Sequence, residues 1–478
     1  MKKIVNIKAI MLVLLSTFTW GCKDFLDVNV DPTLKSDATV QELLPTAQLF
    51  TSETSYQQAF VACQYAQQIG SATGINGADA YFEAENASGW ANMYLNVIPQ
   101  LNTIIKKGST ENIPSYVGIA KIMLAYSLGI ATTNWENIPY SQADQKNFSA
   151  AYDTQQSIYT SIQKLLDEAI VEIAKNTGAK PGIDDMIYAG DMTKWTKLAY
   201  SLKARYALHL SNQNPTTAAQ TALAALQNAM KSNDDDFQLK YNAKNLSPWY
   251  SRVALANTTS NLSVTYSSTF VDMMNGKTQG VVDPRLPLVV AFKRGQTVYA
   301  GSAPGAGAGS TVDFSTTLSW HSTINSPIVM MSFAEVKAIE AEARFLAAGG
   351  TVSTKGATNE AYAAYLDLIR ANMSKVGVSE ANRNTFLSAP QINVGASNLT
   401  LQHIFQEKFK ANFLIGDIWT DLRKYNYFDF PMPLNVNPDL AGKRIARMRY
   451  PSSELTRNAK NAEANIKAPG VNMWLFTK

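Results

Sequence analysis

Helical periodicity is the feature that most limits what this 478-residue chain can fold into. Apolar residues recur at steps of three and four from Tyr116 to Leu128, and again from Ile158 to Ile170. A third stretch of this kind begins at Asp191 or Thr193 and continues to Tyr206. Each pattern places an apolar stripe along one side of a helix. Further helices are expected over Ser332–Leu346, Glu360–Ser374 and Leu401–Phe413.

The expected helices are short, begin with cap-type residues and contain many alanines, which let neighbouring helices approach closely. They predict a mostly α fold of stacked helix-turn-helix pairs of the tetratricopeptide kind, although no strict repeat of about 34 residues is present. From about residue 233 to 327 the pattern changes to short polar and aromatic runs with many turn residues, so a loop-rich insert is expected there. The helical scaffold would then cover about 35–232 and 328–430, and residues 431–478 would form an irregular C-terminal segment.

The N-terminal residues have the pattern of a lipoprotein signal peptide. Basic residues open the chain, an apolar run follows from Ala9 to Leu15, and a glycine precedes Cys22. The apolar run ends at Ser16, well short of the roughly 20 residues that span a bilayer. Thr19 stands where a lipobox usually has Leu. We therefore expect residues 1–21 to be removed and the mature chain to begin at a lipidated Cys22.

The expected mature chain is nearly neutral. Of 42 basic residues, Lys2, Lys3 and Lys8 lie in the signal peptide, which leaves 39 against 38 acidic residues. Electrostatic attraction to nucleic acid therefore has no evident source. Cys22 and Cys63 are the 2 cysteines of the chain, so no disulfide framework is expected, and Cys63 should be a small buried residue.

Motifs for catalysis or metal binding are weak. Ser161 and Lys164 have the spacing of a Ser-x-x-Lys nucleophile, but they lie on an amphipathic helix without companion motifs. The histidines are widely spaced, and Asp234–Asp236 lacks the spacing of an EF-hand and is interpreted as a solvated turn. Gly305–Gly309 follows no strand, so a flexible loop tip is expected there rather than a phosphate cradle. No catalytic residue, metal site or cofactor is predicted, although a carboxylate pair across a cleft stays open.

A series of short motifs runs along the chain from its beginning to its end. These motifs are Cys22–Asn29 with Asp31–Pro32, Asn137–Ala143, Tyr188–Trp195, Asp283–Arg285, Phe333–Val336 with Ala341–Ala343, Trp419–Arg423, and Arg449–Glu454 with Asn458–Ala459. In their order and spacing they resemble the SusD/RagB family of nutrient-binding outer-membrane lipoproteins of Bacteroidetes, particularly its SusD-like branch. Two departures are Gln142, where that family commonly has Glu, and Asn134–Glu136, where Gly is frequent.

This resemblance implies a fold, a location and a partner. The expected fold is a single SusD-like domain over 22–478, in which tetratricopeptide-like helix pairs form a right-handed superhelical scaffold. Asp24 and Asp27 resemble a surface-export signal, so a surface-exposed, lipid-anchored protein of the outer membrane is expected. The implied function is non-enzymatic capture of nutrient oligosaccharides and their delivery to a SusC/RagA-like TonB-dependent transporter. Peptide cargo, a glycan-degrading enzyme and a purely structural adaptor are the alternatives.

Capture of a glycan needs flat aromatic faces beside hydrogen-bonding groups. Members of the family often build the site from an early loop and from later insert loops, which correspond by region to Ser71–Trp90 and Gln296–Trp320. Trp90 and Tyr94 also have helical spacing, which is typical of a core ridge. The candidate ligand-binding residues are Tyr81, Phe82, Trp90, Tyr299 and Trp320, with Asn76, Asp79, Arg294 and His321 as hydrogen-bonding neighbours.

Other aromatic residues are expected in the core. Trp195 and Trp419 fall within amphipathic or packed segments. In the stretch Asp417–Arg423, aromatic and charged groups alternate, and a buried carboxylate–guanidinium pair packed on an indole explains this pattern without a ligand.

Overall fold

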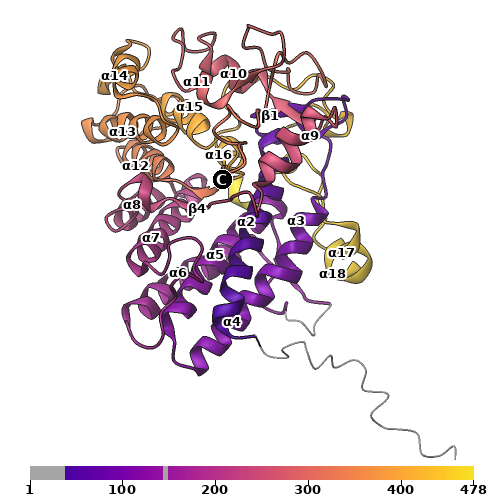
Figure 1. Ribbon diagram of the computed structural model, residues 1–478, viewed down its shortest axis with the longest axis vertical. Coiled ribbons are helices and arrows are strands. Elements are labelled where there is room, and N and C mark those ends of the chain that lie inside the picture. Colours follow the sequence, from indigo (N-terminus) through magenta and orange to yellow (C-terminus); the bar gives the residue numbers. More distant parts are fainter. Residues whose placement is uncertain (1–37, 144–148, 478) are drawn as a thin grey trace, which may run out of the picture. The chain divides into compact units, whose positions relative to one another are not determined.

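A computed structural model describes residues 38–143 and 149–477, and most of this part of the chain is helical (Figure 1). The predicted signal peptide and Cys22 lie outside the described residues. The mostly α fold expected from the periodicity is confirmed.

Successive helices of the scaffold pack against one another in chain order. In Figure 1 they follow each other from α4 at the bottom of the view, through α5, α6, α7 and α8, to α12 and α13. Thr154, Asp191 and Ser332 cap α6, α7 and α12, each by accepting a hydrogen bond from a backbone N–H of the first turn. The predicted helices fall on α5, α6, α7, α12 and α13, except Leu401–Phe413, which falls on α15 (Leu401–Ala411) and was predicted to end later than it does. The helices α4 and α8 were not predicted. The bounds of the scaffold helices are α4 Ile98–Thr110, α5 Pro114–Trp135, α6 Gln155–Ala174, α7 Met192–His209, α8 Pro215–Leu226, α12 Phe333–Ala347 and α13 Asn359–Lys375.

Helix α5 is the apolar centre of this arrangement. It is long and apolar enough to cross a membrane, but 89% of its apolar window is buried inside the fold, so it is a core helix. At Gly129 a side chain would not fit, because a Cβ there would lie 2.1 Å from the Tyr206 hydroxyl oxygen on α7. A glycine at this position therefore lets α5 and α7 approach closely.

Helix α2 (Val40–Tyr65) was not singled out by periodicity, because polar and apolar residues are mixed on the side that it buries. The hydroxyls of Thr51 and Ser55 donate hydrogen bonds to the backbone carbonyl oxygens one helical turn earlier. The Gln58 carboxamide oxygen accepts hydrogen bonds from Asn86 and Asn134. Most of these buried polar groups thus find a partner, although the Thr54 hydroxyl and Gln58 Nε2 have none among the described residues. Cys63, near its end, is fully buried as expected.

The insert begins and ends at one antiparallel strand pair. Strand β4 (Phe237–Leu239) leads into it, and β8 (Ile328–Met331) returns beside β4 to start α12. A second antiparallel pair, β1 (Ile69–Ser71) with β5 (Val264–Tyr266), ties the insert to the loop after α2. Its remaining elements are short: α9 Leu255–Thr258, α10 Ser268–Met274, α11 Leu286–Val289, β6 Ala291–Phe292 and β7 Val312–Asp313.

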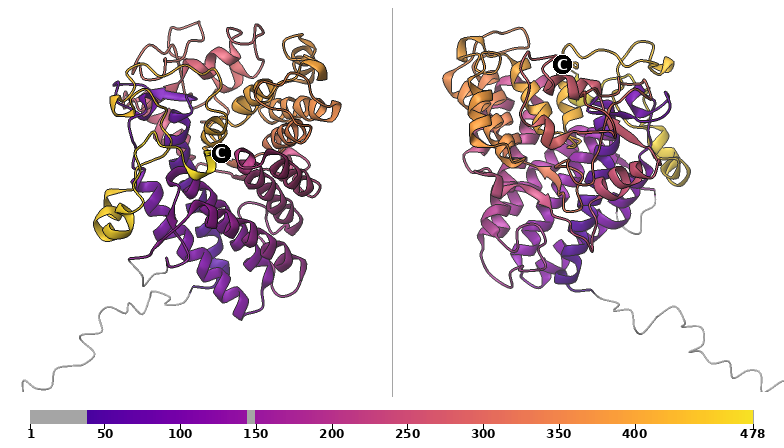
Figure 2. Two further views of the ribbon diagram at one scale, coloured as in Figure 1. Left: turned by 180° about the vertical axis from the view of Figure 1, so that it is seen from behind. Right: turned by 45° about the horizontal axis from the view of Figure 1, so that its top comes forward.

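The last part of the chain returns across the earlier elements. Helices α17 and α18 lie on the opposite side from α12–α14 in all the views of Figures 1 and 2. Met448 and Arg449 donate backbone hydrogen bonds to Asn134 O and Ala84 O, at 2.8 and 3.1 Å. The C-terminal segment is thereby tied to the helices at the start of the chain. The remaining elements are α3 Ala87–Ala91, β2 Ile138–Pro139, β3 Tyr152–Asp153, α14 Glu380–Ser388, α15 Leu401–Ala411, α16 Ile418–Lys424, α17 Ser452–Arg457 and α18 Ala459–Glu463.

Candidate ligand-binding face

The early loop and the glycine-rich loop of the insert lie together, and Asp79 joins them. Its Oδ2 accepts hydrogen bonds from Ser71 N at 3.0 Å and from Gly305 N at 2.9 Å. The Asp79 side chain is fully buried. A carboxylate between two backbone N–H groups of separate loops fixes their relative position. Asp79 is therefore placed to hold these loops together rather than to contact a ligand, which corrects its expected role.

The glycine-rich loop is packed, so the expectation of a flexible tip is wrong. Pro304, Gly305 and Gly307 are buried. Gly305 has φ +75°, and a Cβ there would lie 1.8 Å from Leu434 O. A backbone at positive φ against another backbone accepts only glycine readily. Here the glycines serve close packing.

An exposed aromatic pair of the insert has the character of a ligand-binding surface. The rings of Phe292 and Tyr299 lie 4.2 Å apart between centroids, with an angle of 32° between their planes. Phe292 is 40% exposed and Tyr299 is half-buried. Burial raises the pKa of the Tyr299 hydroxyl. Such a pair offers a flat apolar surface with a polar hydroxyl beside it.

Polar groups surround the backbone of Tyr299. Asn275 Nδ2 donates to Tyr299 O at 3.1 Å and to Asp272 Oδ1 at 2.9 Å. Lys277 is largely exposed and makes a 3.1 Å ion pair with Asp272. We call Phe292, Tyr299, Asn275, Asp272 and Lys277 the aromatic face. Its rings and its amide, carboxylate and ammonium groups together suit a polyhydroxylated ligand.

Two candidate aromatic residues of the early loop are buried, so their expected role in the site is corrected. Tyr81 is fully buried, and its hydroxyl accepts hydrogen bonds from Gln67 and Arg444, at 3.1 and 3.0 Å. Trp90 is 5% exposed and packs edge-on against Trp135. It also lies 4.6 Å from the Tyr94 ring, so the alternative interpretation as a core ridge is the correct one. Neither ring presents a surface to a ligand.

The remaining candidates are accessible but fall into separate places. Asn76 and Arg294 are exposed on loops, and Phe82 is half-buried. The Trp320 ring packs 4.8 Å from that of His321, with Lys375 Nζ 5.5 Å above it. Burial, with help from Lys375, lowers the pKa of His321 to about 3. The structure thus brings Tyr299 together with Phe292, which sequence reasoning missed, and places Trp320 against Lys375 instead.

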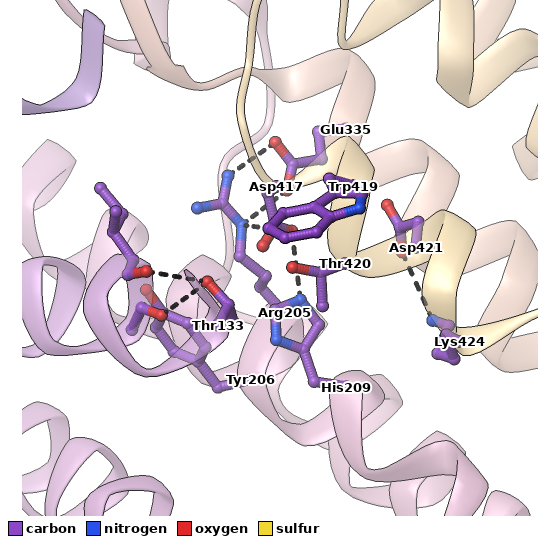
Figure 3. Close-up of polar contacts among 12 residues, drawn as sticks. Thr133, Arg205, Tyr206, His209, Glu335, Asp417, Trp419, Thr420, Asp421 and Lys424 are labelled. Atoms are coloured by element: carbon purple, nitrogen blue, oxygen red, sulfur yellow. Dashed lines mark hydrogen bonds and ion pairs between the residues drawn. The ribbon is translucent and has the colours of Figure 1, made fainter. Parts of the chain in front are cut away.

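Charged residues of several motifs form buried ion pairs within the scaffold (Figure 3). Arg205 on α7 makes a two-pronged contact with Glu335 on α12, at 2.6 and 2.7 Å. Asp417, just before α16, lies 3.7 Å from Arg205 and 3.1 Å from His209. Burial raises the pKa of Asp417, but His209 and Arg205 outweigh it and hold that pKa well below its usual range. These groups join three helices. Their charges are paired with one another, so none is available to bind a ligand.

The prediction for Asp417–Arg423 is right about the stacking and wrong about the pairing. The Arg423 guanidinium lies 3.6 Å above the Trp419 ring. Its N–H groups donate to the carbonyl oxygens of Ala446 and Thr133, both at 2.7 Å. Asp421 instead accepts from Lys408 at 2.8 Å. Trp419 and Trp195 are fully buried, as predicted.

The other charged motifs of the insert are also structural. Arg285 binds Asp283 through two nitrogens and reaches Glu407 of α15 at 2.7 Å, all three being buried. The interpretation of Asp234–Asp236 as a solvated turn is wrong for two of its residues. Asp235 and Asp236 are buried and make ion pairs with Lys197 and Lys375, at 3.0 and 2.6 Å.

Within residues 38–143 and 149–477, no group of three or more His, Cys, Asp or Glu side chains is arranged to hold a metal ion. The aromatic face itself carries no motif. Phe292 stands in the strand β6, which has 2 residues, so no alternation of apolar and polar residues marks its exposed side in the sequence.

The profile of the SusD-like family described as starch-binding and associating with the outer membrane matches residues 32–451. The chain belongs to this SusD-like family. Its members are binding proteins, and the chain is accordingly a binding protein and not an enzyme.

Solved structures of SusD homologues share the fold. One from Bacteroides uniformis is 21% identical, with a TM-score of 0.74, and the match covers 91% of this chain and 99% of that one. A chitin-binding SusD homologue from Flavobacterium johnsoniae is 19% identical, with a TM-score of 0.75 over 92% and 99% of the two chains. A homologue from Bacteroides fragilis is 20% identical, with a TM-score of 0.74 over 92% and 100%. No curated protein matches the sequence.

Proposed function

We propose that the protein captures oligosaccharides at the cell surface through the aromatic face of its insert. The observation that carries this proposal is the exposed Phe292–Tyr299 pair beside Asn275, Asp272 and Lys277. Sugar rings present patches of C–H groups that pack on aromatic rings, while their hydroxyls need planar donors and acceptors at the edge. The starch-binding description of the family and the chitin-binding relative support a glycan as cargo.

The residues of this proposed site have separate roles. Phe292 provides the stacking surface, since its ring is the more exposed of the pair. Asn275 holds the Tyr299 backbone, and Lys277 and Arg294 are exposed donors on neighbouring turns. Trp320 with His321 is a further candidate contact, half-buried beside Lys375.

The proposal includes the anchor and the partner. Cys22 would carry the lipid that keeps the protein at the outer membrane, and a SusC/RagA-like TonB-dependent transporter would receive the cargo. Incorporation of labelled fatty acid that is lost in Cys22→Ala tests the anchor. Co-purification with a β-barrel transporter from the native membrane tests the partner, and recovery of the protein without one contradicts that part.

The test of cargo is isothermal titration calorimetry of the mature chain carrying Cys22→Ser. The ligands are maltoheptaose, chitotetraose and a set of short peptides, and the mixtures are checked for cleavage products. We expect binding of at least one oligosaccharide without cleavage. Binding of peptides alone would move the cargo to peptides, and cleavage would contradict the function.

The aromatic face is tested with Phe292→Ala. A Phe side chain covered by a ligand contributes about 1.5–3 kcal/mol to binding. Its removal should therefore weaken the affinity for the oligosaccharide by about 10-fold or more. Leu95→Ala is the matched control, because Leu95 is 69% exposed on a helical turn that precedes α4, outside the insert. Equal affinity of the two variants would place the oligosaccharide elsewhere.

A further inference from the structure

A separate cavity of ≈ 200 Å³ lies between the early loop and the C-terminal segment. Its lining comes from Glu83, from residues 447–450, from α17 and from the chain after α18. Backbone hydrogen bonds fix the walls: Met448 N to Asn134 O at 2.8 Å, Arg449 N to Ala84 O at 3.1 Å, and Ala446 N to Pro469 O at 2.7 Å. The cavity is thus formed before any ligand arrives, and none of its lining belongs to the aromatic face.

The size of this cavity limits its occupant. Pockets for drug-sized ligands have volumes of about 300–1,000 Å³, so ≈ 200 Å³ suits one small ring and not a polymer segment. Most of the surface is aliphatic, from Met448, Leu455, Ile466 and Pro469. Ile466 is 54% exposed, which leaves apolar surface for a ligand to cover. An aliphatic floor suits the C–H face of a ring.

Hydrogen-bond donors and acceptors also line the cavity. Arg447 is 4% exposed, and its Nε is buried without a hydrogen-bond partner among the described residues. Its other nitrogens donate to Glu136 Oε2 and, at 2.7 Å, to Val471 O. Glu83 has neither an ion pair nor a hydrogen bond within the described part of the chain. Burial raises the pKa of Glu83 against the lowering effect of Arg449. The Glu83 carboxylate is therefore free to accept hydrogen bonds from a ligand, and Arg447 keeps one donor beside the cavity without a partner in the described ranges.

The charges around the cavity balance. Arg449 pairs with Glu85, and both Arg447 and Lys467 pair with Glu136. With Glu83, three cations face three carboxylates, so neither an anion nor a cation is attracted strongly. Carboxylate and guanidinium groups are the planar partners that hydrogen-bond neighbouring hydroxyls. This chemistry favours a neutral polyhydroxylated ring.

We propose that this cavity is a second subsite, which takes one neutral pyranose ring of the glycan or a free monosaccharide. The ring packs on Met448, Ile466 and Pro469, and its hydroxyls reach Glu83, Arg449 and Lys467. This inference rests on the proposed glycan cargo and adds a ring-sized site apart from the aromatic face.

The test is saturation-transfer NMR on the mature chain carrying Cys22→Ser, with glucose and N-acetylglucosamine as probes. Glucuronate and glucosamine are the charged counterparts, and acyclic sorbitol is the polyol without a ring. We expect the neutral rings to give signals that the charged sugars and sorbitol do not compete away. Preferential binding of a charged sugar or of sorbitol would overturn the proposal.

Two variants address the cavity, each with a matched control outside the lining. Ala468→Trp fills the space and should abolish the monosaccharide signal, and Glu83→Gln should weaken it by about fivefold or more. Ala464→Trp and Glu463→Gln are exposed and outside the lining, and should leave it unchanged. Phe292→Ala should leave it unchanged as well.

The outcomes separate this inference from the proposed function. If oligosaccharides bind but the monosaccharide signal is absent, insensitive to both cavity variants or lost in Phe292→Ala, the subsite is refuted and the proposed function stands. If no sugar of any length binds, both fail. Thermal unfolding of each variant checks that a lost signal does not come from a lost fold.

Discussion

The helical scaffold encloses the charged and aromatic side chains of its motifs, whereas the insert leaves one aromatic pair exposed. In the scaffold, Arg205, Glu335 and Asp417 are enclosed and paired with one another, and Trp419 is fully buried. In the insert, the Phe292 ring is 40% exposed. The short motifs that identify the family fall mainly on the enclosed groups, and none falls on the exposed pair. The motifs therefore report how the fold is held together and say little about what it binds.

The two regions meet at a buried charged cluster. Asp283 and Arg285 come from the insert, and Glu407 and Lys410 come from α15. Lys410 reaches Asp283 at 3.1 Å, and both side chains are fully buried. Buried charges require specific geometry, since a displaced partner leaves an uncompensated charge. This junction can thus orient the loop-rich insert on the helical scaffold.

The largest predicted effect comes from breaking a buried ion pair of the scaffold. Arg205→Met removes the partner of Glu335 and leaves a buried carboxylate, which should lower the free energy of unfolding by about 3–5 kcal/mol. Urea denaturation at neutral pH measures this change. Arg252→Met is the control, because Arg252 is half exposed in its pair with Glu53 and should contribute about 1 kcal/mol or less. Similar losses in both variants would show that enclosure does not set the difference.

The next effect concerns the contact between the early loop and the glycine-rich loop of the insert. Asp79→Ala leaves the N–H groups of Ser71 and Gly305 without an acceptor and should lower the free energy of unfolding by about 2–4 kcal/mol. Asp79→Asn keeps an oxygen in the same place and should cost about 1 kcal/mol or less. Urea denaturation compares the two variants. Equal losses would show that the negative charge, and not the shared oxygen, holds the loops.

A smaller effect tests whether the glycine-rich loop is packed. Gly305→Ala should lower the free energy of unfolding by about 2 kcal/mol, because its Cβ would meet Leu434 O at positive φ. Gly309→Ala is the matched control: it also has positive φ, at +93°, but nothing lies within 4 Å of its Cβ. Its cost should be limited to the backbone strain of about 1 kcal/mol. Thermal unfolding of both variants separates the contact from the strain, and equal costs would contradict close packing.

Much of the fold could be predicted from the sequence, since periodicity and caps are local. Asp191 and Ser332 mark helix starts at the residues where the structure has them. Helix α2 was not predicted, because its buried side mixes polar and apolar residues and its polar groups depend on distant partners such as Asn134. Arg423 was placed correctly on Trp419, yet its carbonyl acceptors come from other parts of the chain, which no local pattern reveals.

The aromatic face was harder to predict, because it depends on exposure. Tyr81, Trp90 and Tyr299 looked alike in the sequence as aromatic residues of loop-rich stretches. The structure buries the first two, because Gln67 and Arg444 reach the Tyr81 hydroxyl and Trp135 packs against Trp90. Phe292 was not predicted, because its short strand gives almost no periodic signal. Which aromatic residue stays exposed is decided by long-range packing.

The smallest predicted effect sharpens the comparison within the insert, at His321. This half-buried ring packs beside Phe413 and Trp320, and burial lowers its folded-state pKa to about 3, against about 6.5 in the unfolded chain. The unfolded state therefore binds a proton first as the pH falls, so stability is complete above pH 6.5 and declines toward pH 3. At pH 5.5 the loss should be about 1 kcal/mol relative to pH 7.5, and His321→Gln should lack it. Urea denaturation of both proteins at the two pH values measures the difference. If the decline is the same in both, His321 accepts a proton as readily in the folded protein as in the unfolded chain, and this ring belongs with the exposed side chains of the insert.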